Sequence, residues 1–470
     1  MLFSSLTFLF GFLPVLLIIY FIVKNRNIRN LILLLFSLVF YAWGEPKYII
    51  LMLITITVVY LFGIIIDKFD IEKKYKEKKI SLLLCIIVVI GNLIFFKYTN
   101  FLLDNLRNIF GFNIKNLNIV LPIGISFYTF QILSYIIDLY NKKIKVQKNI
   151  LSLALYVSLF PQLIAGPIVR YETIENEINN RKETLEDIIK GIKRFIIGLS
   201  KKVIIANNMA MLADLIFNNH NNSYGTSIIW LGVLAYTLQI YFDFSGYSDM
   251  AIGLGNVFGF HFLENFNYPY ISKSVTEFWR RWHISLSTWF RDYIYIPLGG
   301  NRVSKIKWIR NIFIVWTLTG LWHGAAWNFI IWGLYYGILL LLEKLYLNKL
   351  LDKLPKTINY IYTIIIIMIG WMIFRANSLN EILLFIKTMF IYHKTDWVTI
   401  ISENLSTFNS LLFIIPAIIF SFPVINIIKD KYGNKTVYII IGNIILIGLF
   451  GICILYLTSS SYNPFIYFRF

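Results

Sequence analysis

Apolar runs recur from one end of the 470-residue chain to the other. A run of roughly 17 or more apolar residues can cross a hydrocarbon core of ~30 Å as a helix. The pattern therefore predicts an all-α polytopic membrane protein with roughly 10–12 membrane-embedded helices, some of them re-entrant where Gly and Pro interrupt a run. The candidate spans are Leu2–Val23, Leu31–Ala42, Tyr48–Ile66, Ile80–Phe96, Ile119–Leu139, Ile150–Ile164, Val203–Phe217, Ile228–Tyr241, Ile312–Leu342, Ile358–Phe374, Leu411–Ile428 and Val437–Leu457. Of these, Ile312–Leu342 is long enough for two crossings or for one strongly tilted helix.

Composition and charge agree with this class. Hydrophobic residues make up 58% of the chain and charged residues 15%, whereas soluble domains are about 45–50% apolar and about 25% charged. The net charge of +19 does not indicate a nucleic-acid partner, because many of the lysines and arginines lie in short loops between apolar runs. Basic short loops face the cytoplasm, so we expect Lys24–Arg29 and Lys68–Lys79 inside, the N-terminus outside and the lipid bilayer as the principal partner.

One segment, Ile271–Arg302, combines aromatic and charged residues. Its tryptophans suit the membrane interface, where aromatic rings lie between headgroups and acyl tails. The segment is equally suited to line a cavity, in which Arg280, Arg281 and Arg291 bind a phosphate-bearing substrate through paired hydrogen bonds. Both interpretations stay open from the sequence alone.

His323 is the sharpest candidate for chemistry, because it lies within a long apolar run. Polar groups in a helical bundle are costly and usually mark function or a compensating partner. A neutral imidazole there can act as a general base, and a hydrogen-bonded packing histidine is the alternative. Trp322 and Asn328 flank it as candidate substrate-binding residues. His283 lies 40 residues earlier, but neither cysteine is near either histidine in sequence, so we expect no metal site.

Several other polar or interrupted segments suit structural roles. Asp243 and Asp249 lie in a polar segment at the end of an apolar span, and we expect either to pair with an arginine of the following segment, with substrate binding as a second role for Asp243. The glycines of Gly253–Gly259 lack the spacing of a dinucleotide fingerprint and indicate helix packing. Cys85 and Cys453 lie in apolar runs and are expected to be buried thiols without a disulfide.

Together these segments resemble the membrane-bound O-acyltransferase family, and most closely its AlgI-like bacterial branch of alginate and peptidoglycan O-acetyltransferases. The resemblance covers nearly the whole chain, so we expect residues 1–470 to form a single O-acyltransferase domain. Its core motifs span about 119–376, and C-terminal helices with a terminal aromatic motif span 411–470. The matching segments are FSSLTFLFGFLP, LPIGISFYTFQ, FPQLIAGPIVR, QIYFDFSGYSDMAIG, FWRRWHISLSTWFRDYIYIPLGGNR, LTGLWHGAAWNFIIWG, WMIFRA and FIYFRF.

The resemblance implies a ring of helices around a central tunnel in a multi-pass bacterial cell-membrane protein. His323 and His283 correspond to the catalytic and second polar positions of the family, and Tyr467 resembles a terminal tyrosine that carries the acyl group. The implied activity moves an acetyl group from a cytoplasmic thioester, acetyl-CoA or another acyl carrier, to an extracytoplasmic cell-envelope polysaccharide. An SGNH-type acetyltransferase or esterase is the implied partner, and no cofactor is implied.

Two alternatives remain open. One is D-alanyl transfer to teichoic acid, which sister branches of the family perform with similar motifs. The other is polysaccharide transport without covalent chemistry. A transporter predicts that His323→Ala leaves function partly intact, whereas a transferase predicts near-complete loss.

Overall fold

The computed structural model describes residues 1–112, 115, 117–219, 224–433 and 435–466, and in these ranges the regular structure is helical, without strands. Eight of the described helices are long and apolar enough to cross a membrane. Nine are obtained if the bent pair Trp397–Glu403 and Leu405–Phe420 is one span. Other predicted segments form shorter apolar helices, for example at Thr7–Ile22. The all-α polytopic class is therefore confirmed.

The contacts divide the chain into two compact units. The N-terminal unit contains Met1–Phe195 and Met250–Leu263, and the C-terminal unit contains Ile196–Asp249 and Glu264–Phe470. Helices α9 (Leu185–Ser200) and α11 (Thr226–Val257) contribute residues to both.

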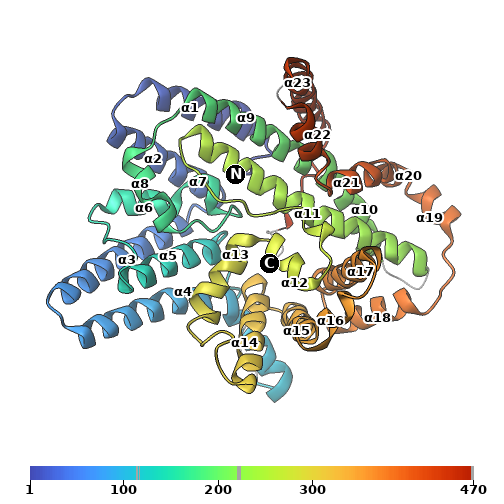
Figure 1. The fold of residues 1–470 in the computed structure, drawn as a ribbon, viewed down its shortest axis with the longest axis horizontal. Helices are drawn as coiled ribbons and strands as arrows, with labels where there is room; N and C mark the ends of the chain where they lie inside the picture. Colours follow the sequence, from blue (N-terminus) through green and yellow to red (C-terminus); the bar gives the residue numbers. More distant parts are fainter. Residues whose placement is uncertain (113–114, 116, 220–223, 434, 467–470) are drawn as a thin grey trace. The chain divides into compact units, whose positions relative to one another are not determined.

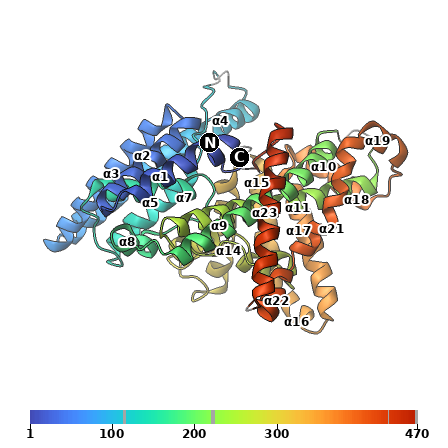
Figure 2. The ribbon, with the colours of Figure 1, turned by 90° about the horizontal axis from the view of Figure 1, so that it is seen from above.

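In the N-terminal unit, helices α1 and α2 lie side by side (Figure 2). Helices α3 and α4 form a long hairpin against which α5 packs (Figure 1). Gly124, in the left-handed conformation, precedes α5, so the expected span from Ile119 begins as non-helical chain. The elements are η1 (Thr7–Phe12), α1 (Leu13–Ile22), α2 (Arg26–Gly44), α3 (Tyr48–Ile71), α4 (Tyr75–Phe110), α5 (Ile125–Tyr140), α6 (Ile150–Ser158), α7 (Phe160–Leu163) and α8 (Tyr171–Asn180).

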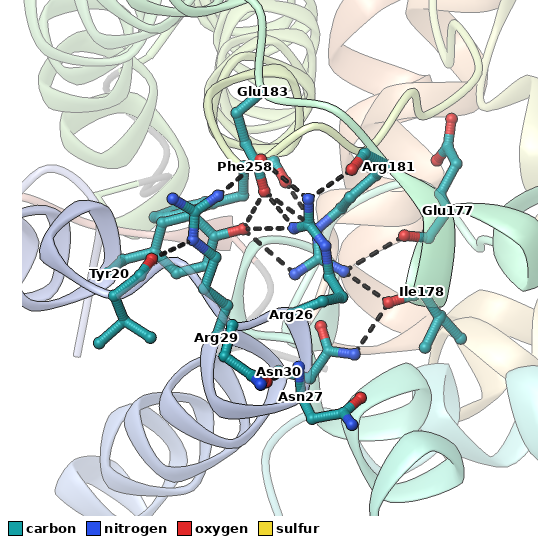
Figure 3. Close-up of polar contacts among 12 residues, drawn as sticks. Tyr20, Arg26, Asn27, Arg29, Asn30, Glu177, Ile178, Arg181, Glu183 and Phe258 are labelled. Atoms are coloured by element: carbon teal, nitrogen blue, oxygen red, sulfur yellow. Dashed lines mark hydrogen bonds and ion pairs between the residues drawn. The ribbon is translucent and has the colours of Figure 1, made fainter.

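A buried ionic cluster joins distant parts of the N-terminal unit (Figure 3). Glu183, between α8 and α9, accepts hydrogen bonds from Arg26 and Arg29 at the start of α2 and from the Tyr20 hydroxyl near the end of α1. Arg181 donates to main-chain carbonyls at the end of α8 and just beyond α11. The cluster thereby holds α1, α2, α8 and the end of α11 together.

The surroundings of Glu183 strongly favour the ionised form of its carboxyl group. Burial by itself raises the pKa of this carboxyl, but hydrogen bonds from Arg26 and Tyr20 outweigh burial and lower the pKa to about 2. The side chain is only 6% exposed, so solvent screens these interactions weakly.

The C-terminal unit holds the remaining helices. They are η2 (Lys201–Ala206), α10 (Asn207–Asn218), η3 (Pro269–Ile271), α12 (Val275–Arg281), α13 (Ile284–Phe290), η4 (Arg291–Tyr295), α14 (Lys305–His323), α15 (Trp327–Leu342), η5 (Glu343–Leu347), α16 (Asn348–Leu351), α17 (Lys356–Arg375), α18 (Leu379–Phe390), α19 (Trp397–Glu403), α20 (Leu405–Phe408), η6 (Asn409–Phe413), α21 (Ile414–Phe420), α22 (Val424–Tyr432) and α23 (Thr436–Ser459). The segment Ile271–Arg302 contains three of them, α12, α13 and η4, in place of one long interfacial helix.

The long run Ile312–Leu342 is two helices, which resolves the alternative left open above. Helix α14 ends at His323 and α15 begins at Trp327. The two pack closely because glycines face the opposite backbone: a Cβ on Gly320 would lie 2.3 Å from the Phe329 carbonyl oxygen, and one on Gly333 would lie 2.3 Å from the Trp316 carbonyl oxygen.

Two details of α11 and its surroundings bear on earlier expectations. The helix continues to Val257, so Asp243 and Asp249 lie inside it and not at the end of a span. Gly253, also in α11, packs on α9, because an added Cβ would lie 2.6 Å from the Gly191 carbonyl oxygen. The helix-packing interpretation of this glycine is therefore confirmed.

Candidate active site

A cavity of about 190 Å³ lies within the C-terminal unit, and both candidate histidines line it. Three parts of the chain form its walls: the segment that runs from α12 through η4, helix α14, and the junction of α15 with η5. The lining residues are Trp279, Trp282, His283, Leu286, Ser287, Phe290, Arg291, Tyr295, Ile312, Val315, Trp316, Thr319, His323, Leu340 and Lys344. The segment Ile271–Arg302 thus forms a cavity wall, the second of the two interpretations that its sequence allowed.

His323 is held by aromatic side chains. Its ring lies 4.9 Å from Trp322, 5.0 Å from Trp332 and 5.1 Å from Phe374, in each case nearly edge-to-face. Asn328 holds the main chain at Phe374, because its Nδ2 donates to the Phe374 carbonyl oxygen at 3.2 Å. As the last residue of α14, His323 precedes an extended Gly324 where the hairpin turns. Its buried ring therefore has a defined orientation at one end of a packed helix.

His283 adopts a left-handed backbone conformation, with φ of 44°, immediately before α13. This conformation costs a non-glycine residue about 1–2 kcal/mol. Asn265 supports it: the Asn265 carbonyl accepts from Ile284 N–H at 2.9 Å, and its side-chain oxygen accepts from the Ser285 hydroxyl at 2.9 Å. In turn Asn265 donates to the Ser248 hydroxyl in α11 at 3.1 Å. Strain retained by such contacts is a feature of functional sites.

The two imidazoles are coupled through one aromatic ring. Trp322 lies 5.9 Å from the His283 ring and 4.9 Å from the His323 ring, measured between centroids. Burial lowers the pKa of His283 to about 3, so this imidazole is neutral at physiological pH. A neutral imidazole has a free acceptor nitrogen for a hydrogen bond, but an imidazole with so low a pKa is a weak proton acceptor.

A buried carboxylate anchors the wall that carries His283. Glu343, at the end of α15, accepts from the backbone N–H groups of Val275 and Thr276 at 2.6 and 2.8 Å. These N–H groups begin α12, where the helix dipole favours a negative charge. Glu343 thereby fixes α12, and through it the position of His283, against α15.

The predicted arginines have different environments. Arg291 lines the cavity and pairs with Asp292 at 2.7 Å, and Lys344 supplies a second cation to the same cavity. Arg280 is exposed and does not line the cavity. Arg281 forms an ion pair with Glu277 at 2.9 Å one helical turn away, which is a contact within α12. Of the three arginines, Arg291 is the one that lines the cavity.

Asp243 lies outside this cavity, and its ion-pair partner differs from the arginine predicted from the sequence. It pairs with Lys202 in η2 at 2.8 Å, not with an arginine of the following segment, and Asp249 similarly pairs with Lys201 at 2.6 Å. The expected partner is absent for Asp243 because α11 continues past it, which turns its side chain toward η2.

The Lys202–Asp243 pair secures the C-terminal segment. Asp243 accepts the backbone N–H of Ile466 at 3.0 Å, and Lys202 donates to the carbonyl of Pro464. Phe465 stacks on Tyr247, with ring centroids 5.2 Å apart. The residues that immediately precede Tyr467 are therefore anchored inside the unit, while Tyr467 itself lies outside the described residues.

Sequence reasoning missed Asn265, Glu343 and Lys202. No local motif marks Asn265, and Glu343 follows an apolar run where a charged residue normally signals only the end of a span. Lys202 stands beside Lys201 in a basic pair that resembles a loop signal. Each takes its role from a partner at least 17 residues away in the chain.

A multi-pass helical protein whose buried cavity holds two histidines and two cations belongs to the class of membrane-embedded enzymes. The family model described as MBOAT, membrane-bound O-acyltransferase family, matches residues 38–386. The chain belongs to this family and is an O-acyltransferase.

The chain is also similar to bacterial relatives with assigned names. It is 46% identical to a probable alginate O-acetylase of Pseudomonas aeruginosa over 384 residues, which are 81% of this chain and 73% of that protein. It is 38% identical to the peptidoglycan O-acetyltransferase of Helicobacter pylori over 83% of this chain and 80% of that protein. A teichoic acid D-alanyltransferase of Bacillus subtilis is 34% identical, but over 47% of this chain and 59% of that protein.

Proposed function

We propose that this enzyme moves an acetyl group from a cytoplasmic thioester, acetyl-CoA, to a cell-envelope polysaccharide outside the bacterial plasma membrane. The observation that carries the proposal is that the buried His283 and His323 line one cavity together with Arg291 and Lys344. The names of the relatives that align with four fifths or more of the chain, all O-acetylating enzymes of polysaccharides, support the same activity.

The chemistry assigns a role to each group. His323 takes the proton of an attacking hydroxyl, whose oxygen bonds to the thioester carbonyl carbon. The carbon–sulfur bond then breaks, and the proton passes from His323 to the leaving sulfur to give a thiol. Arg291 and Lys344 stabilise the negative charge that develops on the carbonyl oxygen. The aromatic side chains that surround the buried histidines limit the access of water and thereby slow hydrolysis of the thioester.

In the proposed pathway the first acceptor is the phenol oxygen of Tyr467. The anchoring of Pro464 and Ile466 by Lys202 and Asp243 supports this role, because it limits the region that the next residue can reach. A second transfer passes the acetyl group to an SGNH-type partner outside the membrane, and from there to a polysaccharide hydroxyl. Each transfer exchanges one ester for another, so no further reactant is consumed.

The proposal is tested with radiolabelled acetyl-CoA and membranes that contain the enzyme and its cell envelope. Wild type is compared with His323→Ala and Tyr467→Phe, and label is followed on the protein and on the polysaccharide. His393→Ala and Tyr392→Phe are the matched controls, because both residues are exposed. We expect both labels in wild type and in the controls, and neither label in His323→Ala or Tyr467→Phe.

Other outcomes contradict specific parts of the proposal. Polysaccharide labelling by Tyr467→Phe removes the relay and leaves direct transfer. No label from acetyl-CoA in wild type, with label from D-alanyl carrier protein, replaces acetylation by D-alanylation. Substantial polysaccharide export with His323→Ala, and no label on the polymer in wild type, identifies a transporter.

A further inference from the structure

The N-terminal unit contains a second, polar cavity of about 400 Å³, which belongs to none of the acyl-transfer machinery. It lies where α3 ends, α4 begins and α5 ends, and the chain that follows α5 completes it. Its volume is in the range of pockets that hold small molecules, about 300–1,000 Å³. The charged residues that line it are Asp67, Asp70, Lys78, Lys142, Lys145 and Lys148.

Positive charge exceeds negative charge in this cavity, with four lysines against two aspartates. Asp70 is already engaged by two of the lysines, at 2.8 Å from both Lys78 and Lys142. Among the described residues, the ion pairs of this region include neither Lys145 nor Lys148, although Lys145 interacts electrostatically with the Glu175 carboxyl. The cavity therefore retains cationic groups for an anion to bind.

One of these lysines is held in a costly backbone conformation. Lys142 has φ of 60° at the end of α5, where its N–H bonds the Leu139 carbonyl and the next N–H bonds the Asp138 carbonyl. Glycine normally occupies this position after a helix. A lysine there is strained, yet it directs an exposed ammonium group, 63% accessible, to the rim of the cavity.

The position of the cavity favours a lipid as the source of the anion. The helices that form it, α3 and α4, carry exposed apolar residues in the turns beside it, including Ile65, Ile80 and Leu83. The charge pattern of the loops predicts that this end of the helices faces the cytoplasm. Basic pockets between helices at that surface bind the headgroups of anionic lipids.

We propose that this lysine-lined cavity binds the headgroup of an anionic phospholipid, with its acyl chains along the exposed apolar turns of α3 and α4. The phosphate contacts Lys142, Lys145 and Lys148. Asp70 holds Lys78 and Lys142 in position through its ion pairs with both. The binding is independent of the proposed acetyl transfer.

The test measures binding of dioctanoyl phosphatidylglycerol to the purified full-length protein in neutral detergent by native mass spectrometry. Dioctanoyl phosphatidylcholine and inorganic phosphate are the comparison ligands. Lys142→Gly is the decisive variant, because glycine suits the left-handed backbone and the change removes only the charge and its contacts. Lys73→Gly is its matched control: Lys73 also has a positive φ, 56°, and lies in the neighbouring α3–α4 turn, but it does not line the cavity.

We expect phosphatidylglycerol to bind in preference to phosphatidylcholine. Lys142→Gly weakens that binding about fivefold, and Lys142→Gly combined with Lys145→Gln and Lys148→Gln weakens it about a hundredfold, since each basic residue near a headgroup contributes about a fivefold effect. Lys73→Gly leaves it unchanged. Equal binding of the two lipids, or equal losses in Lys142→Gly and Lys73→Gly, overturns the proposal. Full displacement of the lipid by millimolar phosphate shows a phosphate site and also overturns the lipid assignment.

Discussion

Glu183 is the group whose removal tests the structure of the N-terminal unit most directly. Glu183→Gln removes the carboxylate that accepts hydrogen bonds from Arg26 and Arg29, and leaves these guanidinium groups close to Arg181 without compensation (Figure 3). Removing one partner of a buried ion pair costs about 3–5 kcal/mol. Because Arg26 is 24% exposed and Arg29 15% exposed, we expect the lower end of that range, about 3 kcal/mol.

The pKa of Glu183 gives a second estimate. A fall from 4.5 to about 2 on folding corresponds to roughly 3 kcal/mol, at about 1.4 kcal/mol for each pKa unit. The folded pKa lies below the unfolded value, so this stabilisation is fully present above about pH 4.5 and is lost as the pH falls toward 2. The two estimates agree, and the stability difference between wild type and Glu183→Gln should shrink on acidification.

The assay is equilibrium unfolding in mixed detergent micelles, followed by tryptophan fluorescence at several pH values between 2 and 7. Glu186→Gln is the matched control, because Glu186 is exposed three residues further along the chain. The reasoning is refuted if Glu183→Gln is no less stable than Glu186→Gln at pH 7. It is also refuted if the gap between wild type and Glu183→Gln is undiminished at pH 2.

Three further predictions concern the other packed regions. Gly320→Ala should destabilise the protein by about 1–3 kcal/mol through overpacking of the α14–α15 hairpin, whereas Gly448→Ala, with open space around it, should be neutral or stabilising in the same unfolding assay. Asp243→Ala leaves its lysine partner buried and unpaired, so we expect a loss of about 3–5 kcal/mol and faster carboxypeptidase digestion of the C-terminal segment. Cys85 and Cys453 are both free and buried, so maleimide should label the folded protein slowly and the denatured protein rapidly; rapid labelling of the folded protein would contradict their burial.

Sequence reasoning named candidate residues for the chemistry, although it did not show how they are arranged. It identified His283, His323 and Arg291, and the structure brings all three to one cavity. It did not separate Arg291 from Arg281 and Asp243, which it named equally as substrate-binding candidates. Those two residues form contacts within α12 and beside the C-terminal segment, respectively.

The sequence by itself determined the class of the protein. Long apolar runs with basic loops can satisfy their backbone in a membrane only as helices, so the polytopic all-α class follows from local pattern. The length of Ile312–Leu342 allowed either two helices or one tilted helix. The structure shows that the segment forms two helices.

The tertiary structure decided which polar groups meet. Asn265 reaches Ser248, Glu343 reaches the start of α12, and Lys202 reaches Asp243, although each pair is separated in sequence by at least 17 residues. Periodicity reports which face of a helix is apolar, but it carries no information on which helix lies opposite. The positions of the histidines depend on those distant partners, because a buried polar group is stable only where another element supplies its hydrogen bonds.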